Sequence, residues 1–206
     1  EKAVTTETPQ KTMPEQEVKA EEKSQNFTIT DDKLGEGGAK TKFHNNMEAI
    51  RTLKQIERED RRATPEEQEI LSKYVGWGGI SQAFDSDNQQ WGKEFSQLFD
   101  ELTPKEYEDA RKSVLDSFFT LPAIIDGIYE ALEKFGFKGG NLLEPAMGVG
   151  NFVGKMPSEM AENTHDYGVE IDSISGRIAK QLYRDADIQV TGFEHTNFQN
   201  GSFDVA

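Results

Sequence analysis

The sequence contains no cysteine, no long apolar run and comparatively few basic residues. Without cysteine, the chain can form neither a disulfide framework nor a cysteine-ligated zinc cluster. No apolar run approaches the ~20 residues that a membrane-spanning helix needs, and the charged N-terminus lacks the apolar core of a signal peptide. The three histidines stand in unrelated surroundings without the spacing of metal ligands, so we predict no metal site. We therefore expect a cytoplasmic protein that does not bind membranes.

Acidic residues dominate the charge of the chain. There are 38 Asp and Glu residues against 23 Lys and Arg, which gives a formal net charge of −15. Binding to DNA phosphates requires clustered Lys and Arg, so this portion is expected to bind DNA weakly or not at all by itself. Contacts with DNA would then come from other parts of a larger, intact protein. The alternative is that the acidic balance only favours solubility.

Three regions differ in composition and pattern. Residues 1–32 are polar, rich in Glu, Lys, Thr and Gln, and are predicted to form a disordered linker. Residues 33–117 carry apolar residues at helical spacing. Within them, Thr64–Glu67 and Thr103–Glu106 each indicate a helix start, with a threonine cap, proline at the first helical position and acid in the first turn. This region is predicted to be a helical N-terminal extension, and residues 118–206 follow a different pattern.

Trp77 lies among the glycines that end the second predicted helix. Two interpretations of this side chain are open. A tryptophan in a turn usually covers a hydrophobic core. A tryptophan between glycines can also approach a ligand or a strand of DNA, on which it could stack. The first interpretation is the more common case.

Short apolar strands alternate with helices throughout residues 118–206. Strands are predicted around Leu142–Leu143, Tyr167–Ile171 and Ile188–Thr191, and a fourth is predicted to begin near Phe203. This alternation is typical of α/β folds, so we predict a doubly wound, Rossmann-like parallel sheet preceded by the helical extension. The helix ahead of the first strand is expected to turn five apolar side chains toward the core: Ile124, Ile125, Ile128, Leu132 and Phe135.

The most informative stretch is Asn141–Phe152, which indicates a strand, an acid at its end, a glycine turn and a helix. The acid is Glu144, and the turn glycines are Gly148 and Gly150. Folds of this class bind ligands at the carboxyl ends of such strands. A second acid, Glu170, ends the next predicted strand 26 positions after the first acid. That is close to the spacing of about 20 residues at which nucleotide-binding units place a ribose-binding carboxylate. The pattern predicts an adenosyl-ligand site.

Two adenosyl ligands can be compared on the same residues. A dinucleotide carries a pyrophosphate and is recognised by G-x-G-x-x-G, but here the third glycine, Gly154, falls one place late. A carboxylate at Glu144 would also repel a pyrophosphate. S-adenosylmethionine (SAM) has no phosphate and carries an ammonium and a sulfonium, and an acid can accept charge-assisted hydrogen bonds from the ammonium. The pattern therefore favours SAM over NAD, and an NAD-dependent oxidoreductase is the less favoured reading.

Several stretches together resemble known proteins. Leu143–Phe152 resembles motif I of the amino-group DNA methyltransferases, the adenine-N6 branch, and Gly168–Asp172 is similar to their motif II. Phe118–Pro122 resembles their motif X, in which a Thr-Pro pair opens a helix at the methionine end of SAM. Leu34–Gly38 and Tyr74–Gly79 resemble the front of very large proteins of bacterial conjugative elements and phages that fuse such a methylase region to a helicase region.

The resemblance implies a set of cofactor-binding residues. Thr120 would contact the methionine carboxylate, although it could instead cap the following helix. Glu170 would accept both ribose hydroxyls and Ile171 would pack on the adenine, with Asp172 rather than Glu170 capping the next helix. Asn197 occupies the place where relatives read the adenine amino group, or it forms a turn. The complete predicted set is Thr120, Glu144, Pro145, Gly148, Gly150, Glu170, Ile171 and Asn197.

The catalytic motif of that family, Asn/Asp-Pro-Pro-aromatic, does not occur in the sequence, so no catalytic residue is predicted. We expect the SAM-binding half of a DNA adenine-N6 methyltransferase, with a sheet truncated before the catalytic motif. Such a sheet would expose an edge through which copies of the chain could associate. The alternative from another class is a degenerate, methylase-like scaffold or DNA-processing accessory domain of a helicase fusion protein.

Overall fold

The computed structural model describes residues 26–115 and 117–206. Most of the predicted linker lies outside these ranges. Its last part differs from the prediction, because residues 26–32 are attached to the remainder of the chain. The backbone N–H of Phe27 donates to the carbonyl oxygen of Leu182 at 2.8 Å, and that of Ile29 donates to Gly154 at 2.8 Å. Burial of the Ile29 side chain supplies the apolar contact that the polar residues before it lack.

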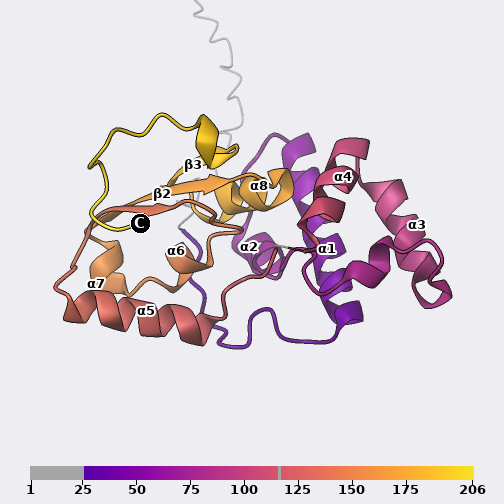
Figure 1. Cartoon of the computed structure of the whole chain (residues 1–206), viewed down its shortest axis with the longest axis horizontal. Coiled ribbons are helices and arrows are strands. Elements are labelled where there is room, and N and C mark those ends of the chain that lie inside the picture. The colour runs from indigo at the N-terminus through magenta and orange to yellow at the C-terminus, as the bar shows by residue number, and fades with distance from the viewer. Residues whose placement is uncertain (1–25, 116) are drawn as a thin grey trace, which may run out of the picture.

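The helical region contains four α-helices, which lie together at one end of the molecule (Figure 1). Both predicted helix starts are confirmed. Thr64 and Thr103 each accept a hydrogen bond from the backbone N–H three residues later, and the glutamate at that position bonds back to the threonine N–H. The elements are α1 (Ala39–Arg58), α2 (Pro65–Ser72), the 3₁₀ turns η1 (Ser81–Phe84) and η2 (Gln89–Trp91), α3 (Gly92–Glu101) and α4 (Pro104–Ser113).

The rest of the chain forms a parallel sheet with helical crossovers, which confirms the predicted α/β class. Its three strands are adjacent in the order β1-β2-β3, and each connection between them contains at least one helix. The elements in chain order are α5 (Pro122–Lys134), β1 (Gly140–Glu144), α6 (Asn151–Lys155), α7 (Ser158–Ala161), β2 (Thr164–Glu170), α8 (Ser173–Leu182), β3 (Asp187–Val190) and η3 (Phe193–His195).

The predicted fourth strand near Phe203 is present as a single parallel bridge on β1, between Leu142 and Val205. The N–H of Leu143 donates to the Val205 oxygen at 2.9 Å, and the N–H of Asp204 donates to the Asn141 oxygen at 2.8 Å. This segment lies on the edge of β1 that faces away from β2.

One hydrophobic core runs through both regions. The helical region and the sheet region contribute to the same cluster because α8 packs against α1, α2 and α4. Close packing of this kind means that the helical region and the sheet position each other. The cluster includes Met47, Ile50, Leu53, Leu71, Trp77, Met147, Val149, Ile174, Ile178 and Leu182. A smaller cluster lies under α5 and contains Ile125, Tyr129, Leu142, Met156 and Met160.

Trp77 belongs to this core. Its side chain is 1% exposed, and its ring makes edge contacts with those of Phe43, Tyr74 and Phe84 at centroid distances of 6.0, 6.4 and 5.3 Å. A ring enclosed in this way cannot stack on a strand of DNA. Of the two interpretations of Trp77, the core role is confirmed and the stacking role is wrong.

The buried face of α5 differs from the predicted stripe. Ile125 is fully buried, but Ile124, Ile128 and Phe135 are 54%, 40% and 87% exposed. The helix instead buries Tyr129, four residues after Ile125 and therefore on the same side of the helix. The prediction counted apolar residues without knowing which side of the helix meets the sheet.

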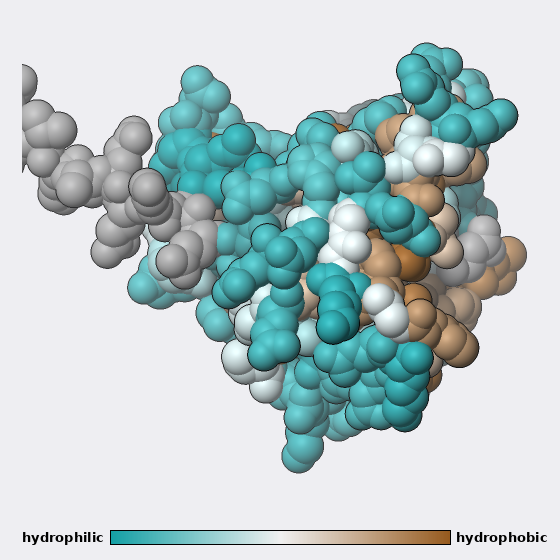
Figure 2. Space-filling view, turned by 90° about the vertical axis from the view of Figure 1, so that its left-hand side faces the viewer, coloured by the Kyte–Doolittle hydropathy of each residue, from teal (hydrophilic) through white to brown (hydrophobic). Residues whose placement is uncertain are grey.

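The face of the molecule in Figure 2 is mostly hydrophilic, with apolar side chains gathered in one area.

A buried carboxylate joins the helical region to the sheet region. Glu106 of α4 is 6% exposed and accepts hydrogen bonds from Lys54 of α1 at 2.7 Å and from Arg177 of α8 at 3.0 Å. Burial alone would raise the pKa of this carboxyl, but the hydrogen bonds from Lys54, the Thr103 N–H and Arg177 outweigh burial and lower the pKa to about 2. Arg177 also bonds Glu57 of α1 at 2.8 Å.

No helix within residues 26–115 and 117–206 is long and apolar enough to cross a membrane.

Candidate cofactor site

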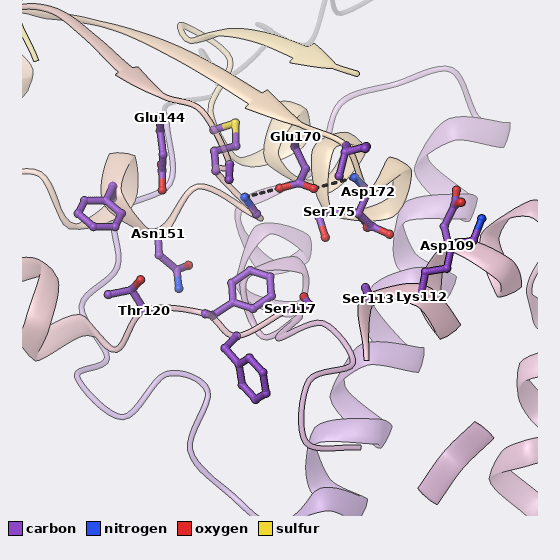
Figure 3. A pocket seen from close by; sticks show the side chains of 17 residues that line it. Asp109, Lys112, Ser113, Ser117, Thr120, Glu144, Asn151, Glu170, Asp172 and Ser175 are labelled. Carbon is purple, nitrogen blue, oxygen red and sulfur yellow. Dashed lines mark hydrogen bonds between the residues drawn. The ribbon is translucent and has the colours of Figure 1, made fainter. Parts of the chain in front are cut away.

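A cavity of about 440 Å³ lies at the carboxyl ends of β1 and β2 (Figure 3). Its volume is within the range of about 300–1,000 Å³ that is usual for small-molecule sites. The sheet supplies one side, and the segment before α5 and the end of α4 supply the other. The lining residues are Asp109, Lys112, Ser113, Ser117, Phe118, Phe119, Thr120, Glu144, Ala146, Met147, Gly148, Asn151, Phe152, Glu170, Ile171, Asp172 and Ser175.

The glycine turn after β1 has the conformation that the sequence predicts. Gly148 and Gly150 have φ angles of 57° and 86°, which favour glycine over residues with a side chain. A Cβ atom added at Gly148 would lie 2.7 Å from the ring of Phe119. The backbone of the turn can therefore lie directly against Phe119, in the segment before α5.

Glu144 projects from the end of β1 toward the cavity (Figure 3). Its Oε2 atom is shut off from solvent and has no hydrogen-bond partner among the described residues. Burial raises the pKa of this carboxyl well above its usual value, and the nearby carboxyls of Glu170 and Asp166 raise it further. An unpartnered buried acid is costly, and a cationic donor in the cavity would remove that cost.

Glu170 ends β2 and is 8% exposed. Its two carboxylate oxygens accept separate backbone hydrogen bonds, Oε2 from Gly148 N–H and Oε1 from Asp172 N–H, both at 2.7 Å. Burial raises its pKa, and these two N–H groups partly oppose that rise. A carboxylate oxygen can accept two hydrogen bonds, so each oxygen retains capacity for one ligand hydroxyl. The ribose contact predicted for Glu170 stays a prediction.

Asp172 caps α8, as predicted. Its Oδ1 accepts the N–H of Ser175 at 2.7 Å, and this bond satisfies one of the free donors at the start of that helix. Its Oδ2 is shut off from solvent and has no hydrogen-bond partner within the described ranges. Glu170 is therefore not needed as a cap and faces the cavity instead.

The other predicted residues divide between the cavity and its surroundings. Thr120 and Ile171 line the cavity. The alternative role of Thr120 as a helix cap is wrong, because Leu121 occupies the N-cap of α5 and no side chain caps that helix. Pro145 is exposed at the turn, and Gly150 is buried at the N-cap of α6; neither lines the cavity.

Asn197 lies after η3, is exposed, and is absent from the cavity lining. The prediction that Asn197 binds the cofactor relied on its position in the sequence after the third strand. The segment after β3 instead runs away from the cavity along the sheet. Its rings pack on the sheet through Phe198 and Tyr167, whose centroids lie 6.2 Å apart.

Three lining residues on α4 were not predicted: Asp109, Lys112 and Ser113. The sequence marks the face on which they lie, since Glu106, Asp109 and Ser113 follow one another at helical spacing. It does not show that α4 packs on α8, and that contact brings this face to the end of the sheet. Asn151 at the start of α6 also lines the cavity and was not predicted.

The charge of the lining favours a cation. Four of the lining side chains are carboxylic acids, and Lys112 is the one Lys or Arg among them. No group of three or more His, Cys, Asp or Glu side chains that could hold a metal ion is found in the part of the chain that the structure describes. The arrangement suits an organic cation held by hydrogen bonds.

No protein-family model matches the chain. The chain is similar to "Defense against restriction protein B" of Escherichia phage P1, with 27% identity over 143 residues that cover 68% of this chain and 5% of the phage protein. It is also similar to a crystal structure from Listeria monocytogenes whose description refers to class I S-adenosylmethionine-dependent methyltransferases. The identity is 14% and the TM-score 0.31, over 77% of this chain and 55% of that one. The chain thus spans only part of each of these proteins.

Proposed function

We propose that this chain is the SAM-binding portion of a DNA adenine-N6 methyltransferase. The observation that carries the proposal is Glu144, a half-buried carboxyl that has one buried oxygen without a hydrogen-bond partner among the described residues and that lines an acidic cavity beside a glycine turn. SAM, when bound, supplies an electrophilic methyl group and brings an ammonium and a sulfonium. A cation with N–H donors is the group that this carboxyl requires.

The residues of the chain would divide the cofactor between them. Glu144 would accept the ammonium, and Thr120 would donate to the methionine carboxylate. Glu170, held rigid by two backbone N–H groups, would accept the ribose hydroxyls. Ile171, which is 73% exposed, would be covered by the adenine. A cofactor would thereby cover apolar surface that is otherwise open to water.

The DNA substrate is proposed for the intact protein and not for this portion alone. The similar phage protein is named for defence against restriction, and modification of DNA bases is one chemical route to that end. The motif X, I and II resemblance points to the exocyclic amine of adenine. The Asn-Pro-Pro-aromatic motif that orients this amine in the family does not occur in the sequence, so transfer would need residues outside it.

One observation favours a second function, a methylase-like scaffold without methyl transfer. Both oxygens of Glu170 are already bonded by the backbone, so this acid has a structural role even without a ligand. A domain that had lost SAM binding would still need it. The unpartnered Glu144 argues against this alternative, because a scaffold gains nothing from a buried acid without a partner.

Calorimetric titration of the chain with SAM, S-adenosylhomocysteine and NAD tests the proposal. We expect saturable binding of SAM and no binding of NAD. Glu144→Gln keeps the shape of the side chain but removes its charge, and should weaken SAM binding at least about tenfold. Glu159→Gln on α7 is the matched control, because Glu159 is exposed and does not line the cavity. If the wild-type chain is folded but does not bind SAM, the result would favour the scaffold function. Preferential binding of NAD would favour an NAD-dependent oxidoreductase.

A further inference from the structure

The helical region closes one end of the cavity. α4 presents Asp109 and Ser113 to the cavity at the end near Asp172 and Ser175, whereas Glu144 lies at the other end (Figure 3). Nothing in the motifs of the sheet region supplies this wall. It comes from a part of the chain that is separated from the first strand by the whole of α5.

Hydrogen bonds of Glu106 hold α4 in place against the neighbouring helices. Glu106 lies one turn before Asp109 on the same face, and its bonds to Lys54 and Arg177 hold α4 against α1 and α8. After the helix, the N–H of Ser117 donates to the Ser113 oxygen at 2.8 Å and continues the turn into the cavity wall. The side chain of Asp109 is therefore presented from a rigid element, which favours specific recognition.

The order of the acids along the cavity assigns an end to each part of an adenosyl ligand. Such a ligand is linear, with the amino-acid part, the ribose and the base in that order. If Glu144 takes the ammonium and Glu170 the ribose, the base reaches the end formed by Ile171, Asp172 and α4. Adenine there presents an exocyclic amino group, which donates hydrogen bonds and needs an acceptor.

Two carboxylates at that end of the cavity, those of Asp172 and Asp109, could accept a hydrogen bond from this amino group. Asp172 caps α8 through its Oδ1, and its Oδ2, although unpartnered among the described residues, is shut off from solvent and so is not open to the cavity. Asp109 bonds only Lys105 among the described residues, at 2.8 and 3.0 Å, in a pair four residues apart whose lysine side chain is 78% exposed. Exposed pairs of this kind are weak and exchange with little cost. A carboxylate also has lone pairs beyond those that one lysine occupies.

We propose that Asp109, on the helical region, is the residue that recognises the base of the ligand by accepting a hydrogen bond from the adenine amino group. This inference rests on the proposed SAM-binding function and deepens it. It gives the helical region a direct part in ligand specificity, in addition to its part in the core. Asp109 would select adenosyl over inosyl ligands, in which a carbonyl replaces the amino group and would face the carboxylate.

The test compares S-adenosylhomocysteine with S-inosylhomocysteine by calorimetric titration. The wild-type chain should prefer the adenosyl ligand by at least about tenfold, the usual effect of a hydrogen bond to a charged group. Asp109→Asn should reduce this preference to about threefold or less, because the amide can donate to the carbonyl of the inosyl ligand. Asp100→Asn on α3 is the matched control, since Asp100 is exposed and outside the cavity lining, and it should keep the wild-type preference.

The outcomes separate this inference from the proposed function. If the wild type binds SAM and S-adenosylhomocysteine but Asp109→Asn keeps the full adenosyl preference, the role of Asp109 is wrong and the SAM site stands. Equal weakening of both analogues in Asp109→Asn would also overturn the base contact, because it would indicate an effect of charge or folding. Thermal unfolding of each variant checks the fold. If the wild type binds none of these ligands, the proposed function fails and this inference fails with it.

Discussion

A buried glutamate, Glu106, and a half-buried one, Glu144, occupy opposite surroundings in this molecule. Glu106, between the helical region and the sheet region, bonds Lys54 and Arg177, and its pKa is lowered to about 2. Glu144, at the end of β1, has no such cation, and its pKa is raised by burial and by neighbouring acids. The same side chain is thus fully satisfied in one place and unsatisfied in the other.

The difference indicates that Glu106 has a structural role, whereas Glu144 is available to a ligand. Every acceptor need of Glu106 is met within the chain, so this residue stabilises the fold and leaves nothing for a ligand. Glu144 destabilises the fold by itself, and such a cost persists where a site is built for a partner. Substitutions of these two glutamates should therefore change the stability of the fold in opposite directions.

The largest effect is expected at Glu106. Glu106→Gln should lower the free energy of unfolding by about 3 kcal/mol at pH 7, because it leaves Arg177 and Lys54 without their shared carboxylate in a buried place. Denaturant unfolding measures this loss. Glu108→Gln on the same helix is the control, since Glu108 is exposed and bonds only Lys112 in the described part of the chain. Glu108→Gln should cause no measurable change. Equal losses of unfolding free energy in the two variants would show that the bonds of Glu106 do not stabilise the fold.

The pH dependence of this loss follows from the lowered pKa. A carboxyl whose folded-state pKa lies below its ordinary 4.5 stabilises the fold above pH 4.5 and loses that contribution as the pH falls toward 2. The difference in stability between the wild type and Glu106→Gln should therefore be constant near neutrality. It should shrink between about pH 4.5 and pH 2.

Glu144→Gln should act in the opposite direction. Removing the charge of a half-buried carboxyl that lacks a cation should raise the free energy of unfolding, on the order of 2 kcal/mol at pH 7. The gain should disappear as the pH falls below the ordinary value of 4.5, where the carboxyl is protonated in both states. The same variant is expected to weaken SAM binding. A variant that lost stability and affinity together would show that Glu144 is structural, like Glu106.

The two glutamates were not equally predictable from the sequence. Glu144 stands between a strand and a glycine turn, and that local pattern alone predicts its place at the edge of a parallel sheet. Glu106 was predicted only as an acid in the first turn of α4. Its bonds to Lys54 and Arg177 join residues 52 and 71 positions apart in the chain, which no local pattern records. Asp109 in the cavity wall was missed for the same reason.

The exposed face of α5 is a second example of a feature that local sequence patterns do not predict. Ile124 and Ile128 follow a helical stripe as regular as the one that is buried, yet the packing of the helix turns Ile125 and Tyr129 inward. Periodicity predicts that a helix forms and cannot by itself choose between two adjacent apolar faces. Helix starts and turn glycines were predictable because their causes lie within a few residues. Contacts between distant elements were not.

The smallest of these effects is expected at Asp166 on β2, which shares the surroundings of Glu144. Burial raises the pKa of Asp166 to about 6, slightly opposed by His165, and its Oδ1 has no hydrogen-bond partner among the described residues. A carboxyl with a raised folded-state pKa binds its proton more tightly in the folded state. The wild type should therefore gain stability as the pH falls from about 6 toward 4.

Asp166→Asn removes that titration. At pH 7 the variant should be more stable than the wild type by about 1–2 kcal/mol, less than a full conversion of the shift because the carboxyl is partly solvated. The advantage should vanish near pH 4, where the wild-type carboxyl is protonated in both states. Denaturant unfolding at pH 7, 6, 5 and 4 measures it, with the exposed Asp100→Asn as control. A constant difference across this range would mean that Asp166 does not titrate as its burial implies.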